Sequence, residues 1–194
     1  MERGDFKGAK KEYRNAIEIQ NDPETVMLYA AALINEIFGY NFGQIVADIY
    51  NNNGRHMLDS LSPETIARAD RDLWELVNAP DFFPSVFDSL IPPADSDTNL
   101  NGAAVYILAG LSHVLNNTAI RDSMAIPNSF SIDSSFFPVN NSSAMDALKK
   151  LEWCLKKSLQ CLNNISSNPG QLVSNLLPEL QEMDKRCISL IVRG

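Results

Sequence analysis

Apolar residues recur every three or four positions along most of this chain, the spacing that places side chains on one face of an α-helix. The spacing predicts helices over residues 23–38, 44–50, 63–79, 101–116 and 144–163, and a last helical stretch over 170–191. With a further helix near the start, the pattern indicates an all-α protein, an irregular bundle of six to eight helices. Two stretches, 23–38 and 101–116, are apolar nearly all round. We expect 23–38 to be the central, most buried helix.

Start and stop signals frame the best-defined of these helices. Ser62 suits an N-cap, Pro63 the first helical position and Glu64 the first turn of the fourth helix. Gly39 suits the C-terminal end of the helix predicted over 23–38. Pro178 lies inside the last helical stretch, where proline removes a backbone donor and clashes with the preceding turn. We therefore expect that stretch to be kinked or split.

Three connections lack a clear helical period. Residues 80–93 hold two aromatic pieces between prolines, which indicates a short helical turn tucked into the core by its Phe residues. Residues 94–98 are polar and are expected to form a linker. Residues 117–141 form a long irregular loop, and such loops are uncommon in compact domains. Its apolar members indicate that it packs on the rest of the chain, with a β-hairpin over 130–137 as an alternative.

The stretch Gly4–Pro23 carries a recognisable signature, G-D-F-K-G-A-K-K-E-Y-R-N-A-I-E-I-Q-N-D-P. One stripe of this helix is formed by Phe6, Ala9, Tyr13, Ala16, Ile17 and Gln20. The stretch resembles the second helix of a tetratricopeptide (TPR) repeat, which has a Gly-Asp-aromatic turn followed by small, aromatic and apolar residues at these positions. The family's closing proline would fall at Asn21, whereas Pro23 suits the start of the next helix.

The resemblance has consequences for the architecture. It implies a TPR-like helical hairpin within residues 1–53, followed by an irregular helical portion over 54–194, in a single domain spanning 1–194. One repeat helix cannot bury its face alone, so the family builds its fold from several units. Either this is a lone helix of TPR type or the chain starts inside a longer protein, and the second is our expectation.

The resemblance also has consequences for function. It implies recognition of a protein partner on a concave face formed by stacked helices, for which Tyr13, Tyr29 and Asn35 are the candidate residues. The chain is also similar to helical, TPR-bearing proteins of the bacterial cell envelope, which are usually lipoproteins. A processed fragment in that envelope and a cytoplasmic protein are the two localisations left open.

Composition and charge narrow the classes of partner. The apolar share is 45%, the charged share is 21%, and the net charge is −8, a balance typical of a globular protein. No run of Lys or Arg is present to neutralise phosphates, which argues against nucleic acid. No apolar run approaches the roughly 20 residues of a membrane span. We expect a protein partner, no nucleic acid and no transmembrane segment, with the oligomeric state open.

One stretch resembles half of a calcium loop. Residues 97–102, D-T-N-L-N-G, follow the D-x-N-x-N-G pattern that delivers hard oxygen ligands at alternate positions. The candidate ligands are Asp95, Asp97, Asn99 and Asn101. The second half of the motif fails, since Leu108 stands where a bidentate Glu is needed. The alternative is that Asn99 or Asn101 caps the helix 101–116.

Other chemistry-bearing residues lack a motif. His56 and His113 stand apart without zinc spacing, and His113 is typical of a hydrogen-bonded core histidine. The three cysteines are expected to be small core residues. The cluster Arg68, Asp70, Arg71, Asp72 and Glu75 is typical of a solvated helix face with partners one turn apart.

These observations favour a non-catalytic protein-interaction or scaffolding module. Two alternatives remain. One is a helical enzyme whose residues converge only in space, which a deep polar cleft with perturbed carboxylates or His56 would favour. The other is a structural domain that binds Ca²⁺ weakly through the half-loop above.

Overall fold

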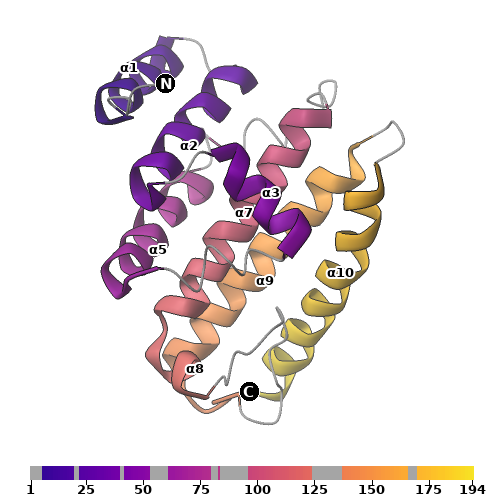
Figure 1. The fold of residues 1–194 in the computed structure, drawn as a ribbon. Helices are drawn as coiled ribbons and strands as arrows, with labels where there is room; N and C mark the ends of the chain where they lie inside the picture. The colour runs from indigo at the N-terminus through magenta and orange to yellow at the C-terminus, as the bar shows by residue number, and fades with distance from the viewer. Residues whose placement is uncertain are drawn as a thin grey trace.

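The chain is all-α, and its core is built around one helix (Figure 1). The computed structural model describes residues 6–19, 22–39, 42–52, 61–79, 83, 96–123, 137–165 and 170–194. Within these ranges there are eight helices and no strand: α1 (Phe6–Ile19), α2 (Pro23–Phe38), α3 (Phe42–Asn52), α5 (Pro63–Asn78), α7 (Ser96–Asn116), α8 (Thr118–Ser123), α9 (Ser142–Asn163) and α10 (Gly170–Arg193). This confirms the predicted all-α fold class.

Helix α7 is the centre of the bundle, with α5 on one side and α9 on the other (Figure 1). Every residue from Ala103 to Val114 is buried, so the helix is covered nearly all round. Helix α10 packs on the outer side of α9. Helix α2 packs against α1, α5 and α7. The expectation that 23–38 would be central is therefore wrong. Helix α2 leaves Leu28 exposed and is more peripheral than α7.

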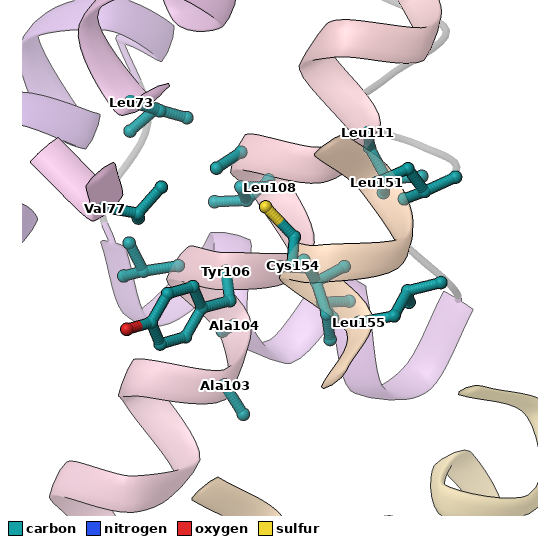
Figure 2. Close-up of a cluster of buried hydrophobic side chains, with 14 of the residues drawn as sticks. Leu73, Val77, Ala103, Ala104, Tyr106, Leu108, Leu111, Leu151, Cys154 and Leu155 are labelled. Atoms are coloured by element: carbon teal, nitrogen blue, oxygen red, sulfur yellow. The ribbon is translucent and has the colours of Figure 1, made fainter. Parts of the chain in front are cut away.

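Small residues let α7 approach α9 closely. A Cβ atom added to Gly110 would lie 2.9 Å from Cys154 Cβ and 2.9 Å from Leu151 Cδ1, closer than real Cβ atoms come. Figure 2 shows Leu151, Cys154 and Leu155 of α9 against the α7 helix, with Leu73 and Val77 of α5 on its other flank. Glycine therefore allows this crossing, which apolar burial then stabilises.

The predicted signals at Gly39 and Ser62 are confirmed, and Asp22 is an N-cap that was not predicted from sequence. The Asp22 side chain accepts the Thr25 N–H at 3.0 Å ahead of α2, and Gly39 ends α2 with φ 69°. Ser62 caps α5 by accepting the Thr65 N–H at 3.2 Å. The predicted stripe of α5 is buried in full: Ile66, Ala69, Leu73, Leu76 and Val77.

Several predicted boundaries were wrong. Helix α7 begins at Ser96, so residues 96–98 are helical and not linker. Part of the predicted loop 117–141 is helix α8, which Asn117 caps by accepting the Ile120 N–H at 3.1 Å. The alternative hairpin lies mostly outside the described residues. Of the aromatic turn predicted over 80–93, only Phe83 is described, and it is buried against Tyr106 with ring centroids 5.2 Å apart.

The two C-terminal helices follow the predicted pattern with adjustments. Helix α9 starts two residues early at Ser142 and is capped by Asn141, whose side chain accepts the Ala144 N–H at 3.0 Å. Helix α10 runs through Pro178 without being split. No helix in the described ranges is both long enough and apolar enough to span a membrane.

Candidate functional site

The groove between α1, α2 and α5, called the α1 groove below, is a cavity of about 430 Å³. Helix α1 forms one wall, α5 forms the other, and α2 supplies the floor between them. Its lining consists of Lys10, Arg14, Ile17, Glu18, Tyr29, Leu33, Asp72, Glu75, Leu76 and Ala79. The apolar members Ile17, Leu33 and Leu76 are buried, so the groove has an apolar bottom and charged rims.

A chain of ion pairs ties the three helices of the groove together. Glu36 on α2 lies between Lys10 of α1, with Nζ 2.8 Å from Oε2, and Arg68 of α5, at 2.5 Å from Oε1. Arg68 also bonds Asp72 one turn along α5 at 3.3 Å. The Lys10 ammonium first, and then Arg68, hold the pKa of Glu36 below its usual range against the opposing effect of burial. Ion pairs to one carboxylate, Glu36 on α2, therefore connect α1 and α5.

Exposed charges at the rims are available to a ligand. Arg14 on α1 and Glu75 on α5 are exposed and form no ion pair with another described residue. Between them, Tyr29 is half-buried, and burial raises the pKa of its phenol while Arg14 and Lys10 oppose that rise. The phenol is therefore protonated and neutral near neutral pH.

A second cavity, of about 300 Å³, is lined mostly by polar side chains and lies between α5, the end of α7 and the start of α9. Its lining includes Asp70, His113, Asn116, Ser143, Asp146 and Lys150. On the rim, Lys150 Nζ bonds Asp146 at 3.2 Å and lies 5.1 Å from the centre of the Trp74 ring. This is the kind of polar cleft that would favour an enzyme.

The wall of this polar cavity holds an Asp–His pair. The His113 imidazole pairs through Nδ1 with Asp70 Oδ1, and Asn116 Nδ2 donates to Asp70 Oδ2 at 2.6 Å. Burial disfavours the Asp70 carboxylate, yet the hydrogen bonds from His113 and Asn116 outweigh it and lower the pKa of Asp70. Asp70 thus faces α7, and its predicted place on a solvated face was wrong. Arg68 and Asp72 form an ion pair one turn apart as predicted, whereas Arg71 pairs with its immediate neighbour Asp72.

The geometry of the pair argues for a structural role. An imidazole oriented by a carboxylate acts as a base through its other nitrogen, which must reach the substrate. Here His113 is only 5% exposed, and its Nε2 is buried with no hydrogen-bond partner among the described residues. Trp74 covers the ring edge-on, with centroids 4.7 Å apart. His113 is a buried core histidine, as predicted, and the Asp70 carboxylate is held ionised.

The predicted partner-binding residues do not share one face. Tyr29 lies in the α1 groove, whereas Tyr13 and Asn35 are half-buried outside its lining. The backbone carbonyl of Asn35 accepts the Gly39 N–H at 2.9 Å, which places it in the last turn of α2. Sequence reasoning missed Arg14, Glu75 and Leu33, which reach the groove from three helices.

The candidate calcium ligands have a helical setting. Asp97, Asn99 and Asn101 lie within α7, and Asp95 lies outside the described residues. Side chains at alternate helical positions point to nearly opposite sides, whereas a calcium loop directs them to one ion. No described group of three His, Cys, Asp or Glu side chains converges as a metal site. The capping alternative was wrong, because Asn99 and Asn101 lie within α7 and not at its start. Ca²⁺ binding stays a prediction.

The remaining reactive residues are in the core. Cys154, Cys161 and Cys187 are free, buried thiols, which confirms the prediction of small core residues. Burial raises the pKa of Cys187 to about 12, so its thiolate is scarce at neutral pH. His56, the other candidate histidine, lies outside the described residues.

The chain matches no protein-family model, no curated protein and no solved structure at a significant level.

Proposed function

We propose that this chain is a non-catalytic protein-interaction module whose partner docks in the α1 groove. The observation that carries the proposal is the anatomy of that groove, an apolar floor between walls that carry charge. Protein interfaces have this arrangement, with a buried apolar centre surrounded by a polar rim. Arg14 and Glu75 stand at the rims without an ion pair to another described residue, so a partner can pair with both.

A protein partner suits the groove better than the other classes of ligand. The chain has a net charge of −8, which disfavours the phosphate backbone of a nucleic acid. The groove mixes both signs of charge with apolar surface, as a stretch of polypeptide does. Catalysis finds less support, because the buried Nε2 of His113 cannot reach a substrate in the polar cavity.

The TPR resemblance supports the same proposal through the residues of α1. Helix α1 packs against α2, as paired helices of a repeat would, and Tyr29 lies between α1 and α5. A TPR-like hairpin made of these two helices would present its partner site at this groove. Helix pairs of this kind also occur outside that family, so the main support for the proposed function is the anatomy of the groove.

The proposal is tested by affinity capture from the source organism with three forms of the protein. The forms are the wild type, Arg14→Glu in the groove and Lys149→Glu on the exposed side of α9. Both variants replace an exposed cation by Glu, so they change net charge equally. We expect the wild type and the Lys149 variant to retain one stoichiometric protein that the Arg14 variant loses. Equal recovery on all three forms, or none on any, would contradict the proposal.

A further inference from the structure

The charged residues that line the α1 groove include some that are paired within the protein and some that are not. On α1, Lys10 and Arg14 are cationic, and Lys10 is already paired with Glu36. On α5, Asp72 and Glu75 are anionic, and Asp72 is already paired with Arg68 and Arg71. Among the described lining residues, this leaves Arg14 and Glu18 on α1 and Glu75 on α5 for a ligand, with Arg14 and Glu75 as the opposite charges on facing walls.

Other groups of the groove fix the position of this charge pair. Glu18 lies one turn beyond Arg14 on α1, so the cationic part of that wall ends there. Between the walls, Ile17, Leu33 and Leu76 form an apolar bottom next to the half-buried Tyr29. A side chain seated there would lie between Arg14 on α1 and Glu75 on α5.

We infer that the α1 groove selects a protein segment that carries a large apolar side chain between an acidic and a basic residue. The acidic residue lies beside Arg14 on α1, the basic residue beside Glu75 on α5, and the apolar side chain sits over Tyr29. This inference rests on the proposed function and names the chemistry of the partner. A reversed segment would place its basic residue beside Arg14 and its acidic residue beside Glu75, where like charges repel.

Blocked synthetic peptides provide the probe. The matched peptide has Leu at its centre, Glu on one side and Lys on the other, with one to three Ala residues as spacers. Three control peptides replace the Glu by Gln, the Lys by Gln or the Leu by Ser. Binding is followed by fluorescence anisotropy and by shifts of backbone amide signals in nuclear magnetic resonance spectra.

We expect the matched peptide to shift amide signals around Tyr29 and Leu33 and to bind more tightly than each control. The Arg14→Glu variant should bind it about fivefold more weakly, since an exposed ion pair is replaced by a repulsion. A peptide with Lys in place of its Glu should recover affinity for that variant. The Lys149→Glu variant should bind like the wild type, and circular dichroism checks that both variants keep their helices.

Two outcomes separate this inference from the proposed function. If partner capture depends on Arg14 while the peptides bind without regard to charge or leave the groove signals unshifted, the inference is overturned and the interaction module stands. If capture does not depend on Arg14, both are overturned. Binding that follows both charges and the central Leu supports the inference.

Discussion

Helices α7 and α1 are the two extremes of packing in this fold. Residues Ala103–Val114 of α7 are all buried between α5 and α9, whereas among the described side chains of α1 only Ile17 is buried. Ile19, at the end of α1, is 88% exposed. Helix α7 is held by apolar burial against several helices and by close approach, whereas α1 packs mainly against one helix, α2, and has an ion pair to Glu36. The weaker packing of α1 is what leaves a groove open for a partner.

The largest effect is expected in the α7–α9 core. Leu155→Ala removes a fully buried side chain, 0% exposed, and should lower the free energy of unfolding by about 3 kcal/mol through lost burial and a cavity. The matched change Leu28→Ala, at a residue 42% exposed on α2, should cost under about 1 kcal/mol. Urea unfolding measures both. Equal losses at the two sites would show that the two regions do not differ as described.

A second prediction concerns the crossing of α7 and α9. Gly→Ala inside a helix normally stabilises by about 1 kcal/mol. At Gly110 the new methyl group would lie 2.9 Å from Cys154 Cβ, so Gly110→Ala should instead destabilise by about 2 kcal/mol. Thermal unfolding reports the sign. A rise in melting temperature would mean that the helices are farther apart than described.

Asp70 links α5 to α7, and its contribution should depend on pH. Asp70→Asn should cost about 1.5 kcal/mol at neutral pH, because the bonds from His113 and Asn116 lose a charged acceptor. The lowered pKa of Asp70 means that this stability is present above the usual value of 3.8 and is lost as pH falls below it. Unfolding curves of the two proteins should therefore converge in acid. A constant difference down to about pH 2 would rule out this link.

The smallest stability effect is expected at the groove. Glu36→Gln leaves Lys10 and Arg68 without their shared carboxylate and should cost about 1 kcal/mol, as expected for a half-exposed network. Because the pair to Lys10 joins α1 to α2, the helix on which α1 mainly packs, hydrogen exchange should quicken in α1 and stay unchanged in α7. Exchange that quickens equally in both helices would contradict the separate stability of the two regions.

Local signals predicted much of the fold. Asp22, Ser62 and Gly39 act through residues within four positions, so the bounds of α2 and α5 could be predicted closely. The central helix could not be predicted from sequence, because residues 23–38 and 101–116 have the same all-round apolar pattern. What separates them is the close approach at Gly110, whose partners lie more than forty residues away on α9.

The candidate site was less predictable for the same reason. Asp70 has the sequence context of a solvated helix face, yet its partners His113 and Asn116 come from another helix. The α1 groove likewise brings Arg14, Tyr29 and Glu75 together from three helices. Of these, only Tyr29 was a candidate from sequence, through the TPR resemblance. Side chains that meet only through tertiary packing leave no periodic signal in the chain.

The most direct test of the groove as a docking site is site-specific photo-crosslinking at two tyrosines. Tyr29 lies in the groove lining and Tyr13 is half-buried outside it. Each is replaced in turn by benzoylphenylalanine, and the protein is irradiated in an extract of the source organism. The account predicts a protein adduct from position 29 that is absent at position 13 and is abolished by Arg14→Glu. An adduct at position 13 alone, equal adducts at both positions, or none at position 29 would contradict it.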